Sequence, residues 1–250
     1  MAGSGFHILD HWHGPHGVLV AHTDGVHEYR QLELEGDNDG IWPPQPNVEV
    51  KIDPDWRIDG VPESYLDPDS VTGTSPSAGR GGLGPVFKDE QNAFVRTLPN
   101  YGLGSWLRDD AAESDSRVIA FFRKRPDADR GEFDGFVQRL GRIFLEAGLL
   151  EVRVQTYSPY NPDIWLTYNV EHDNPAEREY HAAIIVAGPD RASIEEVLQS
   201  EEIAKTGPDQ QKYFLAVHAY AGAIPELLAG SGIALRNGIP LVARGMWILP

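Results

Sequence analysis

The sequence predicts an α+β fold built from two similar halves, and three observations lead to this prediction. Short apolar runs alternate with stretches of helical periodicity over residues 117–220. Parts of this pattern recur at a nearly constant spacing, since Glu90–Phe94 parallels Asp209–Tyr213 and Gly25-Val26 parallels Gly148-Leu149. The composition, with 41% hydrophobic and 24% charged residues, is that of a globular protein rather than a disordered one.

The second half shows the clearest order of elements. Its apolar or alternating runs predict strands at Arg117–Arg123, Glu151–Tyr157, Tyr180–Ala187 and Phe214–Tyr220. Residues 130–147 have apolar side chains at helical spacing, and Gly148 follows as a stop. Ser193–Glu196 fits a capping box that opens a second helix. The resulting order, βαββαβ, is that of a ferredoxin-like unit.

The chain therefore divides into a first ferredoxin-like half (residues 1–107), a charged linker (108–116), a second half (117–220) and an extension (221–250). The first half lacks an obvious first strand. The extension contains the β-prone run Ile239–Leu249, and the hypothesis is that this run completes the first half.

Composition and charge exclude several classes of function. The absence of cysteine excludes disulfides, thiolate metal sites and cysteine nucleophiles. A net charge of −17 opposes binding to nucleic acid and to anionic membranes. No apolar run approaches the roughly 20 residues of a membrane span, and the first residues lack the features of a signal peptide. We therefore expect a cytoplasmic protein, and the sequence leaves a homodimer open.

Histidines are concentrated at the start of the chain. Six of the nine lie within the first 27 residues, at His7, His11, His13, His16, His22 and His27. They are interleaved with Trp12, Pro15 and an apolar run, so the cluster belongs to the fold and is not an affinity tag. Imidazole exchanges protons near neutral pH, which makes this cluster the main candidate for acid–base chemistry.

The spacing of Trp12, His16, Gly25 and Tyr29 resembles the helix-to-strand signature of EthD-type proteins. Ile58–Tyr65 resembles the third strand of that family, and Phe87–Phe94 resembles the end of its second helix. The resemblance covers residues 6–101 and extends more loosely over 117–220. It implies a relative of the dimeric α+β barrels, in which two ferredoxin-like sheets enclose an apolar cavity. Here the two fused halves would form that barrel within one chain.

The second half departs from this signature, with Gly135, Arg139 and Val152 at the positions of the Trp, His and Tyr. Any chemistry of the signature residues therefore belongs to the first half. We expect His16 to act as general acid or base, Tyr29 as a donor to an oxyanion and Asp59 as a carboxylate that orients the histidine. Residues expected to bind the substrate are Trp12, His13, His22 and His27. The structural alternatives are a buried histidine, a strand tyrosine and a turn aspartate.

These expectations define a cofactor-independent enzyme acting on a hydrophobic aromatic or polyketide-like carbonyl compound, as an isomerase, cyclase, dehydratase or lyase. No cofactor and no metal is expected. One alternative is an oxidoreductase that uses haem, with His172, His181 or His218 as ligand, or a metal at the pairs His7/His11 and His13/His16. The other is a protein that binds a small molecule without catalysis.

Overall fold

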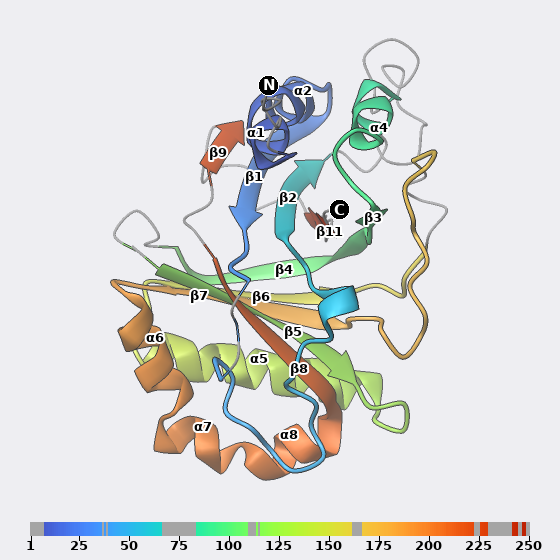
Figure 1. Ribbon diagram of the computed structural model, residues 1–250. Coiled ribbons are helices and arrows are strands. Elements are labelled where there is room, and N and C mark those ends of the chain that lie inside the picture. The colour runs from blue at the N-terminus through green and yellow to red at the C-terminus, as the bar shows by residue number, and fades with distance from the viewer. Residues whose placement is uncertain are drawn as a thin grey trace, which may run out of the picture.

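The computed structural model of the chain describes residues 8–36, 38, 40–66, 84–109, 114, 116–161, 167–222, 226–229, 242–244 and 247–248. These residues form an α+β fold with two groups of strands and a helical layer outside each group (Figure 1). Within the described residues the strands form one continuous sheet in the order β3-β11-β2-β10-β4-β6-β7-β5-β8, with β1 and β9 attached at β2 and β1.

The second half contains the predicted strands and first helix in order, but three short helices replace the single second helix, and Asp190 rather than Ser193 caps the first of them. Its elements are β5 (Ser116–Lys124), α5 (Arg130–Glu146), β6 (Glu151–Tyr157), β7 (Ala182–Gly188), α6 (Arg191–Leu198), α7 (Glu201–Lys205), α8 (Gly207–Tyr213) and β8 (Phe214–Gly222). The strands pair antiparallel in the order β6-β7-β5-β8. The Asp129 carboxylate caps α5 by accepting from the N–H of Glu132, as the side chain of an N-cap residue does.

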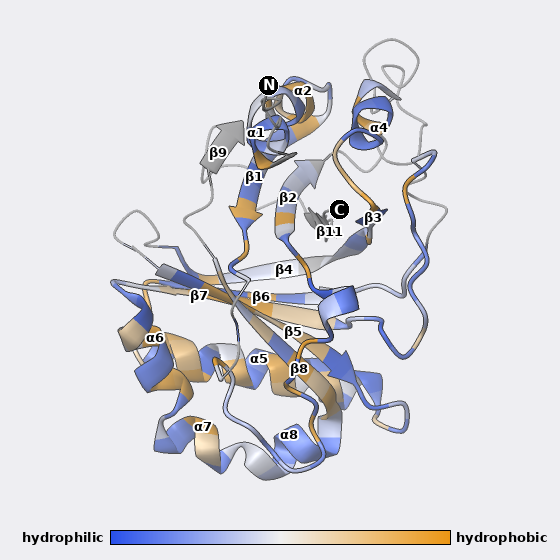
Figure 2. Cartoon of the chain, viewed as in Figure 1, coloured by the Kyte–Doolittle hydropathy of each residue, from blue (hydrophilic) through white to orange (hydrophobic). Residues whose placement is uncertain are grey.

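The four helices of this half cover one face of β5–β8 (Figure 1). Phe133, Phe136 and Leu140 of α5 are fully buried against Val118 and Phe122 of β5. Figure 2 shows hydrophobic residues along these helices and strands, while the connecting loops are mostly hydrophilic. This apolar layer is the largest of the four hydrophobic clusters among the described residues, and burial of apolar surface in it stabilises the half.

The first half begins with α1 (Ile8–His11), the π-helix η1 (Trp12–His16) and α2 (Gly17–Ala21). The elements that follow are β1 (Val26–Glu33), η2 (Pro54–Trp56), β2 (Gly60–Leu66), α4 (Gly84–Glu90), β3 (Arg96–Thr97) and β4 (Asn100–Asp109). Three strands come from the end of the chain: β9 (Glu226–Ala229), β10 (Val242–Arg244) and β11 (Trp247–Ile248).

Strand β10 lies between β2 and β4 and pairs antiparallel with both. In a ferredoxin-like unit this is the position of the first strand, for which the sequence of the first half contains no candidate. The strand order β1-β2-β10-β4 therefore corresponds to β6-β7-β5-β8 of the second half, with β10 in the place of β5.

The two groups of strands meet at β4 and β6, which pair over most of their lengths. At the opposite edges, Leu34 forms a bridge to Gly222, and the N–H of Glu35 donates to the carbonyl of Ala221. Side chains alternate across β1. Leu32 and Leu34 pack with the second half, whereas Tyr29 packs under α2 and α4. The histidine-rich helices therefore lie on the outer face of the first group of strands (Figure 1).

Candidate functional site

The histidine cluster is shaped by a π-helical turn, Trp12–His16, between two α-helical turns. Pro15 lacks an N–H, so the α-helical hydrogen bond to the carbonyl of His11 cannot form. The N–H of Gly17 instead reaches back to the carbonyl of Trp12, five residues earlier. In such a turn residues five apart lie on one side of the helix, and π-helical turns occur frequently at functional sites.

The wide turn brings His11 and His16 to the same carboxylate, that of Asp89 on α4. The Nδ1 atom of His16 lies 2.9 Å from Oδ2 of Asp89. The Nε2 atom of His11 lies 3.1 Å from Oδ1 and 3.0 Å from Oδ2. The hydrogen bond from His16 is the largest cause of the lowered pKa of Asp89, so this carboxyl group stays ionised below its usual range. Asp89 is therefore the negative charge that orients His16.

His16 itself is 1% exposed, whereas the side chains of His11 and Asp89 are partly open to solvent. The rings of His16 and Phe94 form a T-shaped contact, with 5.3 Å between centroids and 86° between planes. Phe94 also packs with Trp12 in a small hydrophobic cluster. The imidazole is thus held between an anion on one side and aromatic groups on the other.

Gln31 of β1 connects three of the residues predicted for the site. Its amide nitrogen donates to the carbonyl of Trp12 at 2.6 Å and to the Tyr29 hydroxyl at 3.2 Å. Its oxygen accepts from Nδ1 of His13 at 3.2 Å, and Nε2 of His13 lies 3.3 Å from Oε2 of Glu33. Burial raises the pKa of Tyr29 well above its usual value, against the opposing effect of the Gln31 bond. Tyr29 is therefore a protonated donor.

The other predicted residues lie apart from this group. The Asp59 carboxylate accepts from Arg57 at 2.7 Å, and its charge acts weakly on Tyr220, which is buried in the cluster packed between the two halves. His22 directly follows α2 and is exposed, and its ring bonds to the carbonyl of Val18 in that helix. His27 is half-buried at the start of β1. The structure therefore brings together His16, Trp12, His13 and Tyr29 and places Asp89 where Asp59 was expected.

Asp89 and Gln31 were not predicted as site residues. Asp89 lies within Phe87–Phe94, a segment noted only for its resemblance to a family helix. Asp89 and His16 are 73 residues apart, and no local pattern links them. Gln31 follows Tyr29 at i+2, which places both on one face of a strand. That alternation was the one available signal.

The histidines considered for haem have protein partners. His172 bonds to Thr97 and accepts from the N–H of Thr167. His181 accepts from the N–H of Lys124, and burial lowers its pKa to about 4. His218 lies 2.6 Å from the Tyr180 hydroxyl. His7 lies outside the described residues. Within those residues, no cluster of at least three His, Cys, Asp or Glu side chains is arranged to hold a metal ion.

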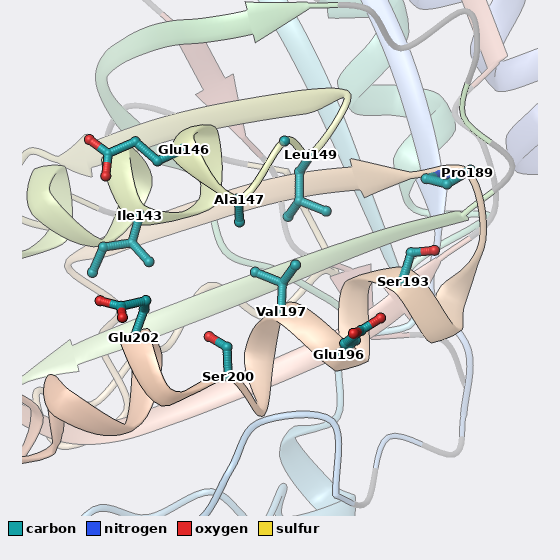
Figure 3. A pocket seen from close by; sticks show the side chains of 11 residues that line it. Ile143, Glu146, Ala147, Leu149, Pro189, Ser193, Glu196, Val197, Ser200 and Glu202 are labelled. Atoms are coloured by element: carbon teal, nitrogen blue, oxygen red, sulfur yellow. The ribbon is translucent and has the colours of Figure 1, made fainter.

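A surface groove lies on the opposite side of the molecule, between α5 and the helices α6 and α7 (Figure 3). Its volume is about 580 Å³. Ile143, Leu149 and Val197 form apolar parts of its lining, and Glu196 and Glu202 belong to its rim. None of the residues predicted from the sequence lines it.

Comparisons with protein families, curated proteins and solved structures found no match to this chain. Among the helices of the described ranges, none combines the length and the hydropathy of a membrane-spanning segment. The arguments about function therefore rest on the geometry of the site.

Proposed function

We propose that this protein is a cofactor-independent enzyme that moves protons on a hydrophobic carbonyl compound, with His16 as the general acid and base. The observation that carries the proposal is the carboxylate of Asp89, which accepts hydrogen bonds from both His16 and His11. A carboxylate at Nδ1 fixes the tautomer and the orientation of an imidazole, so that Nε2 is the atom that exchanges a proton with a substrate.

In this reaction His16 removes a proton from the carbon beside the substrate carbonyl. The electron pair of that C–H bond forms the enolate, and the Tyr29 hydroxyl donates to the enolate oxygen. His16 then returns the proton to a different atom, which gives an isomer, or to a leaving group, which gives elimination. The aromatic side chains of Trp12 and Phe94 beside His16 suit an apolar, aromatic substrate.

We further propose that the chain is a tandem duplication closed into an α+β barrel of the EthD type. The matching strand orders of the two halves support this proposal, as does the Leu34–Gly222 bridge at the free edges. Gly25 and Gly148 are equivalent in the two halves and have φ angles of 86° and 89°. That conformation favours glycine, which explains why both halves contain it there.

Deuterium exchange tests the proposed chemistry without knowledge of the natural substrate. The protein is incubated in D₂O with a panel of aromatic ketones and 1,3-diketones, including 2-tetralone, and incorporation is followed by mass spectrometry. We expect exchange above the buffer rate and a decrease of about 10²- to 10⁴-fold in His16→Gln. Tyr168→Phe, at an exposed position, is the control. Absence of exchange across the panel, or wild-type rates in His16→Gln, contradicts the proposal.

A further inference from the structure

The groove between α5 and the helices α6 and α7 is an apolar hollow at the surface. Figure 3 shows Ile143, Ala147 and Leu149 pointing toward Val197 across it. Ala147 is exposed, and Ile143 and Val197 are half-buried, so this apolar floor remains in contact with solvent. Apolar surfaces bordered by polar residues are typical of places where another molecule binds.

A smaller hollow of about 260 Å³ adjoins the groove and shares Ile143 and Glu146 with it. Phe136 of α5 and Thr206, between α7 and α8, belong to its lining. The two hollows together follow α5 from Phe136 to its end, which is about 15 Å of helix. A surface of this length matches about three turns of a second helix.

The groove is negatively charged. Glu146, Glu196 and Glu202 are exposed at its rim, and no Lys, Arg or His is among the residues that line it. Lys205 pairs with Glu201 and Glu202. Within the described ranges of the chain, Glu146 and Glu196 take part in no ion pair. The charge at the rim is therefore only partly compensated from within the chain.

Two helices end at the groove, α5 at Glu146 and α6 at Leu198. The C-terminal end of a helix carries partial negative charge from its last carbonyl groups, which basic side chains in the last turn offset. Neither helix has a basic residue in its last turn. The helix ends and the glutamates therefore form one negative surface. Such a departure from the usual charge pattern is expected at a functional site.

We propose that this surface is the docking site for a basic amphipathic helix of a partner protein. The apolar side chains of the partner pack against Ile143, Leu149 and Val197, and its Lys or Arg side chains lie over Glu146 and Glu196. A helix fits this surface because the lining residues belong to helices and to the loops next to them, and no strand edge is among them.

Charge favours this partner over others. The net charge of −17 repels nucleic acid and anionic membranes. A second copy of the chain in a two-fold arrangement would bring the same glutamates together. A basic partner is attracted at long range as well as in contact. Arg139 and Arg142 line the smaller hollow, so the most basic part of the partner helix belongs over the groove.

A designed peptide tests the docking site without knowledge of the natural partner. The probe is fluorescein-labelled acetyl-LKKLLKLLKKLLKL-amide, whose leucines form one face of a helix, and a peptide of the same composition without such a face is the control. Fluorescence anisotropy measures both at an ionic strength of about 0.15 M, which screens charges that are not in contact. We expect the wild-type chain to bind the amphipathic peptide at least about tenfold more tightly, because only this peptide buries its leucines together.

Two variants separate the apolar floor from the charge. Ala147→Trp fills the groove at an exposed position without a change of charge, and we expect it to weaken binding by about tenfold or more. Glu146→Gln combined with Glu196→Gln removes two charges and should weaken binding about tenfold. Asp127→Asn combined with Glu177→Gln removes the same charge at exposed positions outside the groove, and should bind within about twofold of wild type.

Circular dichroism and melting temperature establish that each variant is folded, and if Ala147→Trp does not fold, the comparison of the two double variants decides. Three binding results would overturn the inference: equal binding of the two peptides, wild-type binding by folded Ala147→Trp, or equal weakening by the two double variants. The first and the third would mean attraction by the overall charge alone. A wild-type chain that is dimeric in analytical ultracentrifugation, and monomeric as Ala147→Trp, would also overturn it, since a second copy would then occupy the groove.

Discussion

Nδ1 of His16 lies 2.9 Å from Oδ2 of Asp89, so an imidazole from the first helical segment is bound to a carboxylate that is 73 residues away in sequence. The π-helical turn allows His11 to reach the same carboxylate. A single side chain of α4 thereby fixes two rings of the histidine cluster. The pair His16–Asp89 is the feature on which the acid–base proposal depends.

Replacement of Asp89 by Asn tests this pair through stability. The hydrogen bond from His16 lowers the pKa of Asp89 in the folded chain below the value of 3.8 that applies to the unfolded chain. The stabilisation from this bond is therefore complete above pH 3.8 and is lost as the pH falls through the folded-state pKa. We expect Asp89→Asn to lower the free energy of unfolding by about 1–2 kcal/mol at neutral pH, a modest value because Asp89 is partly exposed. Urea denaturation of both proteins should show that this difference becomes smaller at pH values below 3.8, the pKa of Asp89 in the unfolded chain. A difference that is independent of pH would contradict the pairing.

Tyr29→Phe tests the donor predicted from the sequence. The variant removes the acceptor of one Gln31 N–H, and we expect a loss of about 1–2 kcal/mol in the free energy of unfolding. Deuterium exchange into the ketone panel should fall about 10²- to 10³-fold, because a donor to the developing oxyanion is lost. Because the pKa of Tyr29 is raised from 10.0, exchange by the wild type should show no loss from Tyr29 ionisation at that pH. An unchanged exchange rate in folded Tyr29→Phe would exclude it from the reaction.

The resemblance to a family signature grouped Trp12, His16 and Tyr29, which come from one continuous segment. In the structure Gln31 links Trp12 to Tyr29, and Phe94 contacts both Trp12 and His16. The carboxylate could not be chosen in this way, because Asp59, directly before β2, and Asp89, within α4, are both acidic residues of the first half that no local pattern distinguishes. The two carboxylates differ in the face of the first group of strands on which they lie. Asp89 lies under the histidine helices, whereas the charge of Asp59 acts on Tyr220 between the two halves.

Local patterns and long-range pairing also explain which parts of the fold could be predicted from the sequence. The second half has strong periodicity because α5 and β5–β8 bury most of their apolar side chains against each other. The first half takes strand β10 from the end of the chain, and a short strand of three residues has little periodicity of its own. Its place between β2 and β4 is decided by backbone pairing at long range, which a sequence window does not contain.

Glu63→Gln tests the contact between the two halves. Oε2 of Glu63 on β2 accepts from Nη1 of Arg153 on β6, and both side chains are buried. Removing one charge leaves the guanidinium less compensated in the interior, so we expect a loss of about 3–5 kcal/mol in the free energy of unfolding. Asp209→Asn at the exposed Arg139–Asp209 pair is the matched control, with an expected loss of about 0–1 kcal/mol. Equal effects in urea denaturation would show that the Glu63 contact is not buried in solution.

Removal of residues 239–250 tests whether a strand from the end of the chain completes the sheet of the first half. Without β10, β2 and β4 lose their shared neighbour and expose backbone groups. We expect amide hydrogens of β1, β2 and β4 to lose protection in hydrogen exchange, while those of β5–β8 retain it. A truncated chain with unchanged melting temperature and unchanged protection would contradict the role of β10.

The burial of His218 predicts how the free energy of unfolding changes with pH. Burial lowers its pKa from 6.5 to about 3, and its Nδ1 lies 2.6 Å from the Tyr180 hydroxyl. Between these two values the unfolded chain binds a proton that the folded chain does not, so stability rises with pH by up to about 1.4 kcal/mol per unit. His218→Gln removes this proton. The difference in unfolding free energy between wild type and variant should therefore increase from pH 4.5 to 6.5, whereas a constant difference would place a charged imidazole in the folded protein.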